Sequence, residues 1–277
     1  MRPRIVEFLI DAFQTDLVFY LVPTGTTIYV IAILTVSWVF VRRCDYSGLS
    51  VYHARIACII SALCAILGSR IFYLIINLEH TIEHPHMLYN LFGGTVSWGA
   101  YTGAIFSFLI YLKKKKLPVL VYADVLVASL GLGPVIGRWS CFLNGCCYGT
   151  LSNVSWTVKY PKYSLAYKTH IEAGLIDWSE TLSSSVHSVQ IYSSIAAFFI
   201  FLVVSKLWQR FRSKPGITFM LYWLIYCTIR FWIEFLRGDV DRFGSISFTK
   251  SQFICLIIIV VALMGLIHRR LFYSKIE

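Results

Sequence analysis

The chain has 277 residues, of which 57% are hydrophobic and only 14% are charged, and its mean hydropathy is +0.68. So few polar side chains cannot cover a soluble globule of this length, which excludes a soluble protein and indicates one embedded in a membrane. The formal net charge of +11 would suit a nucleic-acid partner, but the basic residues form short clusters between apolar segments. Because no basic and aromatic recognition motif accompanies them, we expect no nucleic-acid binding.

Seven apolar stretches are each about as long as the ~20 residues that cross a membrane as a helix. They cover residues 19–41, 54–76, 89–112, 117–137, 189–207, 216–236 and 251–268. The sequence therefore predicts an all-α integral membrane protein, a bundle of seven transmembrane helices. The first stretch is too long for a secretory signal and lacks a small-residue cleavage pattern, so we expect it to remain in the mature protein.

Lysine and arginine gather in every second gap between these stretches and in the tail. The clusters are Arg42, Arg43 and Arg55; Lys113 to Lys116; Lys206, Arg210, Arg212 and Lys214; and Arg269, Arg270 and Lys275. Basic loops of membrane proteins stay on the cytoplasmic side. We therefore expect the N-terminus outside the cytoplasm and the C-terminus inside it.

The one long gap, residues 150–188, falls on the outer side of the membrane in this topology. It mixes a short alternating piece, VSWTVKY, with polar turns, which predicts a small extracytoplasmic head. No repeat, linker or low-complexity tract divides the chain. We expect a single membrane domain, residues 1–277, with the head inserted between the fourth and fifth spans.

Charged residues recur at the outer ends of three predicted spans: Arg70 in the second, Arg138 in the fourth, and Arg230, Glu234 and Arg237 in the sixth. A charge within a span costs on the order of 2.5–3.5 kcal/mol, so several at one depth require partners or a ligand. One interpretation is a buried ion pair that orders the bundle. The arginines outnumber the carboxylate, however, and guanidinium groups suit a bidentate phosphate, which at this depth is a phospholipid headgroup.

Glycines accompany these charges in the third and fourth spans. They are Gly93, Gly94, Gly99 and Gly103, and then Gly131, Gly133 and Gly137. Missing side chains allow helices to pack closely, or they leave a groove for an acyl chain. Both interpretations remain open from the sequence.

Three of the eight cysteines, Cys141, Cys146 and Cys147, cluster in the stretch GRWSCFLNGCCYG. The spacing C-x4-C-C fits the common metal-binding patterns poorly, so we expect no metal. Tight packing and a redox-sensitive thiol are the other interpretations. A thiol oxidoreductase is disfavoured because vicinal cysteines form strained disulfides, and an ion transporter is disfavoured because the charges gather near one leaflet rather than at the midplane.

Seven segments, in this order, carry a resemblance to a known family. They read RRCDYSGLS, LGSRIFYLI, GGTVSWGAYTGA, GRWSCFLNGCCYG, SWTVKYP, SVHSVQIY and GITFMLYWLIYCTIRFWIEFLRGD. Their order and spacing over residues 42–256 resemble the bacterial prolipoprotein diacylglyceryl transferases. The resemblance implies a seven-helix bundle with a periplasmic head, located in the bacterial cytoplasmic (inner) membrane.

The same resemblance implies an enzyme that transfers the diacylglyceryl group of phosphatidylglycerol to the lipobox cysteine of a prolipoprotein, the first step of lipoprotein maturation. Its partners would be phosphatidylglycerol, lipobox signal peptides and membrane lipids, with glycerol-1-phosphate as by-product and no cofactor. The alternative is a paralogue that keeps the anionic-lipid cleft and has lost thiol transfer. Because the acceptor thiol comes from the substrate, we expect the three clustered cysteines to be dispensable for the covalent step.

Residue roles follow from the family motifs. The resemblance implies catalytic roles for Arg138 and for Arg230 and Glu234 of R-F-x-x-E-F-x-R, with Glu234 chiefly orienting its neighbours. It implies substrate binding by Arg70, Arg237, Gly93, Gly94, Trp98, Gly99, Asn144, Gly149, His187, Gln190 and Tyr192. The chain departs from the family where Cys141 and Cys146 replace an asparagine and a glutamate, and where Trp98 replaces a tyrosine or histidine.

Overall fold

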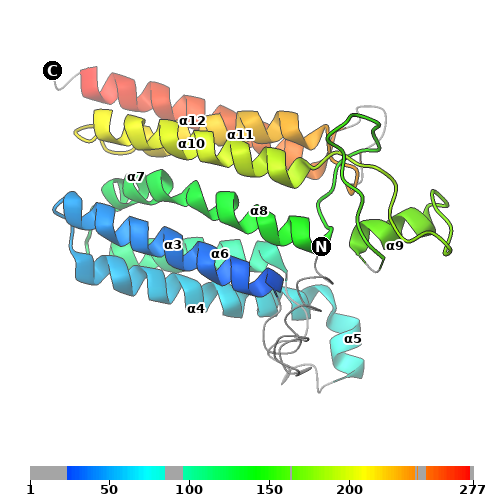
Figure 1. The fold of residues 1–277 in the computed structure, drawn as a ribbon. Coiled ribbons are helices and arrows are strands. Elements are labelled where there is room, and N and C mark those ends of the chain that lie inside the picture. The colour runs from blue at the N-terminus through cyan, green and yellow to red at the C-terminus, as the bar shows by residue number, and fades with distance from the viewer. Residues whose placement is uncertain (1–23, 85–95, 163, 241, 243–247, 275–277) are drawn as a thin grey trace, which may run out of the picture. The chain divides into compact units, whose positions relative to one another are not determined.

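The structure is a computed structural model that describes residues 24–84, 96–162, 164–240, 242 and 248–274. The described residues form ten α-helices and no strand, joined by turns and isolated β-bridges. The helices are α3 (Thr24–Tyr46), α4 (Val51–Ile76), α5 (Leu78–Glu83), α6 (Ser97–Lys114), α7 (Val119–Leu130), α8 (Leu132–Asn144), α9 (Leu165–Glu172), α10 (Val189–Arg210), α11 (Ile217–Glu234) and α12 (Lys250–Ser274) (Figure 1). The prediction of an all-α protein is thereby confirmed for these residues.

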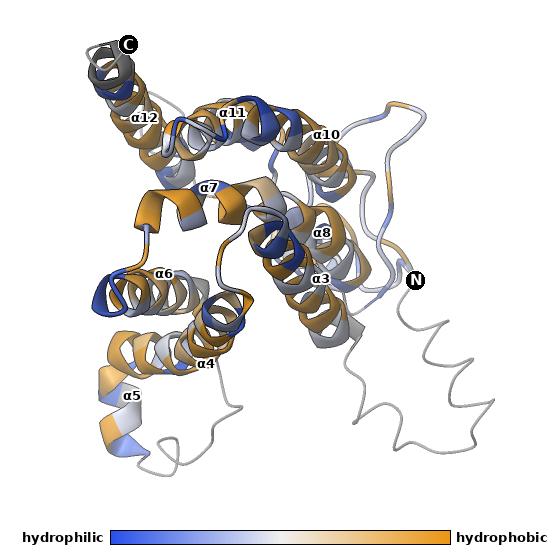
Figure 2. Ribbon diagram, turned by 90° about the vertical axis from the view of Figure 1, so that its left-hand side faces the viewer, coloured by the Kyte–Doolittle hydropathy of each residue, from blue (hydrophilic) through white to orange (hydrophobic). Residues whose placement is uncertain are grey.

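Five of the helices are long and apolar enough to cross a membrane: α3, α4, α10, α11 and α12. The bent pair α7 and α8 makes a sixth if it counts as one span. Large apolar side chains such as Leu34, Ile66 and Ile257 lie exposed on these helices, whose ribbons are largely apolar (Figure 2). The chain is therefore a multi-pass membrane protein. Helix α6 has 18 residues and ends in lysines without reaching the same apolarity, so the count of seven spans stays a prediction.

The fourth predicted span, residues 117–137, is bent in the structure. It comprises α7 and α8, which meet at Gly131 at an angle of 40°, and α8 continues to residue 144. Pro134 has no N–H to donate to the carbonyl four residues earlier, which favours a break at this point. Gly131 allows a close approach to α10, because a Cβ there would lie 2.9 Å from the Cβ of Phe201. As a consequence, Arg138 lies in the middle of α8 rather than at its end.

The chain divides into two compact units, which we describe separately: Ser37–Val125, and the remainder from residues 1–36 and 126–277. In the first unit, α4 and α6 lie side by side (Figure 1). Their contact depends on glycines, since a Cβ on Gly99 would overlap the carbonyl oxygen of Gly68, and one on Gly103 would overlap that of Cys64. The G-x-x-x-G spacing on α6 thus serves close helix packing. Packing accounts for these two glycines, and a substrate-binding role for Gly99 stays a prediction.

Substituting Gly99 by alanine should destabilise the protein. The added methyl group would push α4 and α6 apart, and overpacking of this kind typically costs about 1–3 kcal/mol. The thermal unfolding temperature of the purified protein in detergent measures the effect. Gly133→Ala is the matched control, because a Cβ there meets only Val36 Cγ2 at 3.6 Å, an ordinary contact. Equal unfolding temperatures for Gly99→Ala and Gly133→Ala would contradict the packing interpretation.

In the second unit, α8 packs on α10, α10 on α11, and α11 on α12. One link between α8 and α10 is the hydroxyl of Ser194, which donates to the carbonyl of Val135 at 2.7 Å. The described segments 145–162, 164–188, 235–240 and 248–249 lie at the end where α8 and α11 finish and α10 and α12 begin (Figure 1). This end of the unit therefore gathers the motifs that the sequence singled out.

The described part of the predicted head, residues 150–162 and 164–188, contains the short helix α9, and its role as a separate inserted head stays a prediction. Ser164 caps this helix by accepting from the backbone N–H of Tyr167 at 3.2 Å. Isolated bridges tie the flanking segments together, among them Val158 to Val186 and Pro161 to Leu182. A buried cluster of Phe142, Tyr148, Tyr160, Ala166 and Val186 joins this segment to the end of α8. The location of the segment outside the cytoplasm stays a prediction.

Acidification should weaken this segment through His170. The ring is buried against Tyr148, and its Nδ1 accepts the backbone N–H of Ser184 at 3.2 Å. Burial lowers the pKa of His170, so at mildly acidic pH the unfolded chain binds a proton at this histidine more readily than the folded chain does. The contribution of His170 to the free energy of unfolding is therefore fully present above the ordinary histidine pKa of about 6.5 and is lost as the pH falls below it. Thermal unfolding between about pH 8 and 5.5 measures this, and His170→Gln should flatten the profile; an unchanged slope would refute the assignment.

Candidate active site

Two arginines surround one carboxylate at the end of α11. The side chain of Glu234 is 0% exposed; its Oε2 lies 2.7 Å from Nη2 of Arg230, and its Oε1 lies 3.5 Å from Nη1 of Arg237. The spacing of the three residues places them on one face of the chain as α11 finishes. Both guanidinium groups are largely buried, with 15% and 13% of the side chains exposed. The buried charge of Glu234 is thus compensated from two sides.

The beginning of α12 holds the same carboxylate from another direction. Thr249 and Gln252 form a capping box in the sequence TKSQ: the N–H of Thr249 donates to Gln252 Oε1 at 2.9 Å, and the N–H of Gln252 donates to Thr249 Oγ1 at 3.3 Å. The Thr249 hydroxyl donates in turn to Glu234 Oε1 at 3.2 Å, and Gln252 Nε2 donates to the carbonyl of Phe231 at 3.2 Å. The cap therefore joins α12 to α11 and orients Glu234.

Sequence reasoning missed Asp239, although it follows Arg237 by two residues. Nε and Nη2 of Arg237 donate to the two carboxylate oxygens of Asp239 at 2.9 and 3.0 Å, a bidentate pair. We call Arg230, Glu234, Arg237 and Asp239 the arginine network. Within this network two guanidinium groups face two carboxylates. The remaining positive charge at this site belongs to Arg138.

Arg138 and Arg230 line one small cavity among α8, α10 and α11, which we call the helical cavity. Pro134 of α8, Ser193 of α10 and Tyr226 of α11 are among the other lining residues. Its volume is about 20 Å³, which accommodates a water molecule and is too small for a phosphate group. The structure thus brings two of the predicted catalytic residues together from different helices.

Two polar groups in the wall of the helical cavity lack partners. Nη1 of Arg230 and the hydroxyl of Ser193 are buried and have no hydrogen-bond partner among the described residues. Leaving a buried polar group unpaired costs about 1–3 kcal/mol, and each such group in a native fold requires an explanation. Both are donors, so an acceptor-rich ligand would satisfy them.

The stretch after the cysteines meets the arginine network through the backbone. Gly149 pairs with Arg237 in an isolated antiparallel bridge, in which the N–H of Thr150 donates to the carbonyl of Leu236 at 2.8 Å. Only glycine fits, because a Cβ on Gly149 would collide with His187, and one on Gly238 would collide with the carbonyl of Gly149. The cysteine-containing stretch that ends at Gly149 and the arginine motif around Arg237 are far apart in the sequence, and this bridge holds them next to each other.

Other predicted site residues support this junction. Gln190 is buried, and its Nε2 donates to the carbonyl of Cys146 at 2.8 Å and to the hydroxyl of Tyr160 at 2.9 Å. Nδ1 of His187 lies 3.2 Å from the hydroxyl of Tyr192. Asn144 ends α8. These contacts make Gln190 a link between the signature stretch and α10, and substrate binding by these residues stays a prediction.

The three clustered cysteines converge. Their sulfur atoms all lie within 4.8 Å of one another, and Cys141 is buried. The hydroxyl of Tyr29 lies 3.3 Å from Sγ of Cys141. Hydrogen bonding to the sulfur of Cys141 raises the pKa of the thiols of Cys146 and Cys147. We call these three residues the cysteine cluster.

The remaining predicted site residues belong to the unit of α4 and α6. Arg70 is buried on α4 with its guanidinium 5.2 Å from the ring centroid of Tyr73, a cation–π contact. Trp98 is exposed at the beginning of α6, beside Gly99. Gly93 and Gly94 lie outside the described residues. Arg70 and Arg138 belong to different units, and their predicted meeting stays a prediction.

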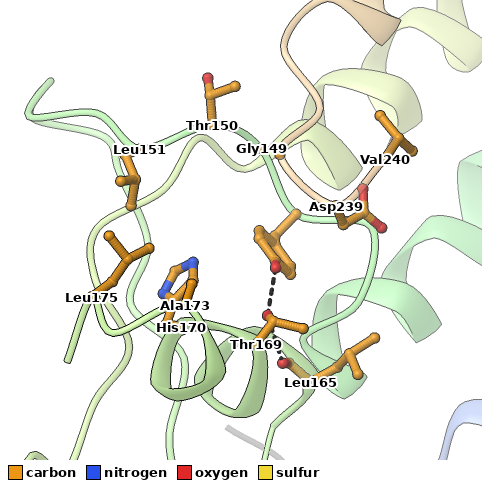
Figure 3. A pocket seen from close by; sticks show the side chains of 12 residues that line it. Gly149, Thr150, Leu151, Leu165, Thr169, His170, Ala173, Leu175, Asp239 and Val240 are labelled. Carbon is orange, nitrogen blue, oxygen red and sulfur yellow. Dashed lines mark hydrogen bonds between the residues drawn. The ribbon is translucent and has the colours of Figure 1, made fainter. Parts of the chain in front are cut away.

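A second, larger cavity of about 650 Å³ lies in the head, and we call it the head cavity (Figure 3). Leu151, Leu165 and Leu175 give it apolar walls, and His170 and Asp239 add polar groups (Figure 3). Asp239 connects its wall to the arginine network. Its size and mixed lining are typical of sites for small ligands or peptide side chains.

Comparison with known proteins identifies the family. A family model described as prolipoprotein diacylglyceryl transferase matches residues 16–268. The chain belongs to this family. It is 34% identical over 224 residues to the phosphatidylglycerol–prolipoprotein diacylglyceryl transferase of Clostridium tetani, covering 80% of this chain and 83% of that protein. It is 32% identical over 233 residues to phosphatidylglycerol–prolipoprotein diacylglyceryl transferase 2 of Clostridium perfringens, and the match covers 83% of this chain and 84% of that protein.

A more distant transferase of Thermotoga maritima is 26% identical over 249 residues, covering 88% of this chain and 80% of that protein. The family resemblance noted in the sequence is thereby confirmed, and the chain is a transferase. Nothing in these similarities supports the alternative of a lipid-binding paralogue without activity.

Proposed function

We propose that this transferase moves the diacylglyceryl group of phosphatidylglycerol to the lipobox cysteine of a prolipoprotein, with Arg138 and Arg230 holding the lipid phosphate. Family membership and the names of the relatives support the reaction. In it, the glyceryl carbon–oxygen bond to phosphate breaks and a carbon–sulfur bond forms. The thiol proton balances the charge of the glycerol phosphate released, and nothing is oxidised or reduced.

The main support for this phosphate site is that two arginines line one cavity, next to hydrogen-bond donors that have no partner among the described residues. Arg138 and Arg230 line the helical cavity, and Nη1 of Arg230 and the Ser193 hydroxyl have no partner among the described residues. Phosphate oxygens are strong acceptors and would satisfy both donors. Since the cavity holds only about 20 Å³, the headgroup enters by moving the lining side chains apart.

Catalysis by these residues is electrostatic. As the carbon–oxygen bond breaks, negative charge grows on the departing phosphate, and preorganised guanidinium groups stabilise it where little water competes. Glu234 acts as a positioning residue, because Arg230, Arg237 and Thr249 occupy its oxygens. A carboxylate engaged in this way is a weak base, so its role is to aim Arg230 at the phosphate.

The head cavity suits the acceptor protein. Its volume of about 650 Å³ and its leucine walls would receive apolar peptide residues that follow the lipobox cysteine, while Asp239 ties the cavity to the arginine network. The arrangement requires the head to be extracytoplasmic, with seven spans in the bacterial inner membrane, the N-terminus outside and the C-terminus inside. The basic clusters at the opposite ends of the helices support this orientation.

Mass spectrometry of a lipobox peptide tests the function directly. Incubation with purified protein and phosphatidylglycerol should add the mass of one diacylglyceryl group to the peptide cysteine. Absence of this mass gain, with a folded protein, would disprove the transferase proposal. A matched peptide with serine for the lipobox cysteine is the control and should remain unmodified.

A series of peptide lengths tests the head cavity in the same assay. Peptides that end at the cysteine lack the residues that would occupy the head cavity. Their contacts would stabilise the bound substrate and the transition state equally, so these peptides should show a higher KM than longer ones and a similar kcat. Equal KM values across the series would exclude the head cavity as the acceptor site while leaving the transfer reaction intact.

A further inference from the structure

The cysteine cluster has the arrangement of a ligand set. The sulfur atoms of Cys141, Cys146 and Cys147 all lie within 4.8 Å of one another, and the described residues contain no other such group of three histidines, cysteines or carboxylates. None of the three is engaged in a disulfide. Packing alone does not require three thiols to converge on one point.

Backbone geometry explains how the spacing C-x4-C-C achieves this. Helix α8 ends in a Schellman motif: Gly145 has a φ of +66°, its N–H donates to the carbonyl of Phe142 at 3.2 Å, and the N–H of Cys146 donates to the carbonyl of Cys141 at 3.1 Å. This motif brings the side chains of Cys141 and Cys146 together. Cys147 then has a φ of +57°, uncommon for a non-glycine residue, and completes the turn that returns its thiol to the same point.

We propose that Cys141, Cys146 and Cys147 bind one thiophilic metal ion, Zn²⁺ or Cu⁺, through three thiolates. A metal–sulfur distance of about 2.3 Å places the sulfur atoms roughly 3.8–4.0 Å apart, so only a small contraction of the cluster is needed. Soft thiolate ligands select these ions. Binding forms three metal–sulfur bonds, releases three thiol protons to solvent and changes no oxidation state; with Zn²⁺, water takes the fourth position.

The surroundings suit a metal–thiolate group of net negative charge. Arg138 precedes Cys141 by three residues on the same helix face and interacts electrostatically with Cys141 and Cys147, and Arg237 interacts with Cys147. The hydroxyl of Tyr29 can donate to the sulfur of Cys141 at 3.3 Å. Such outer contacts orient metal ligands and tune the ion. A bound ion would therefore fix the end of α8 that carries Arg138.

A disulfide is the competing use of these thiols. It would join two sulfur atoms at about 2.05 Å and leave the third cysteine without a role, and a bond between adjacent Cys146 and Cys147 would be strained. The convergence of all three sulfur atoms favours the metal. Oxidation to a disulfide is thus an alternative result of the test.

Metal titration of the reduced full-length protein in detergent tests the proposal without reference to lipid transfer. Cobalt(II) is the probe for the zinc site, because thiolate coordination gives a charge-transfer band in the near ultraviolet. We expect one Co²⁺ per chain, displaced by one Zn²⁺, and a metal-dependent rise in the thermal unfolding temperature. A parallel titration with Cu⁺ under anaerobic conditions distinguishes the two ions by competition.

Cysteine variants locate the site. Cys146→Ser should abolish the cobalt band and the thermal shift, whereas Cys227→Ser, which removes one member of a thiol pair between α11 and α12, should keep both. The unfolding temperature of each metal-free variant shows whether it folds. Failure of the folded, reduced wild type to bind metal, retention of the band in Cys146→Ser, or quantitative formation of a disulfide in place of metal binding would each overturn the proposal.

Discussion

Replacing Arg138 by alanine should slow diacylglyceryl transfer about a hundredfold while the protein remains folded. Removing a charge-assisted contact from a buried site costs about 2–5 kcal/mol, and a loss of about 2.7 kcal/mol in the transition state alone corresponds to this factor. Arg138 has no salt bridge to any described carboxylate, so its removal leaves none of these carboxylates without its partner. Release of glycerol phosphate from phosphatidylglycerol, measured with folded yield, gives the rate.

Two further variants make the Arg138 result specific. Arg138→Lys keeps the charge but loses the planar fork, so its rate should fall between those of wild type and Arg138→Ala. Arg212→Ala removes the same charge beyond the other end of α10, a helix of 22 residues and therefore about 33 Å long, and should leave the rate unchanged. A wild-type rate for folded Arg138→Ala would refute the phosphate contact.

The sequence predicted the apolar helices well because their signal is local. Long runs of apolar residues bounded by basic clusters require only length and composition, and α4, α10 and α12 closely match the predicted spans. The G-x-x-x-G spacing of α6 was equally visible, but it could not distinguish packing from a lipid groove. Packing and a lipid groove can be distinguished only when the helix opposite these glycines is known, here α4 with Gly68. The composition of α6 does not identify that helix.

The predicted site was incomplete where its geometry depends on turns. Asp239 pairs with Arg237 only because the chain turns after α11, and Thr249 reaches Glu234 through a helix cap. The C-x4-C spacing fits the common metal-binding patterns poorly, but the Schellman turn after α8 brings positions five residues apart together. Short-range backbone geometry, more than missing residue types, accounts for these omissions.

The double variant Arg230→Met with Glu234→Gln should recover folding and still transfer diacylglyceryl groups about a hundred times more slowly than wild type. Arg230→Met alone weakens the compensation of the buried Glu234 carboxylate, and breaking a buried ion pair costs about 3–5 kcal/mol of stability. Glutamine at 234 removes that charge and keeps an acceptor for the Thr249 hydroxyl, while Arg237 retains Asp239. Folded yield and headgroup release, measured on the same preparations, separate the two effects.

Recovery of folding without recovery of rate distinguishes a phosphate ligand from an internal counter-ion. If the sole role of Arg230 were to neutralise Glu234, the charge of Arg230 would no longer be needed once Glu234 is uncharged. The double variant would then regain activity along with stability. If Arg230 also offers Nη1 to a phosphate in the helical cavity, no uncharged side chain replaces it, and the loss of about 2.7 kcal/mol persists in the transition state. Restored turnover in the double variant would therefore exclude Arg230 from the phosphate site, and Arg138 would have to hold the headgroup without it.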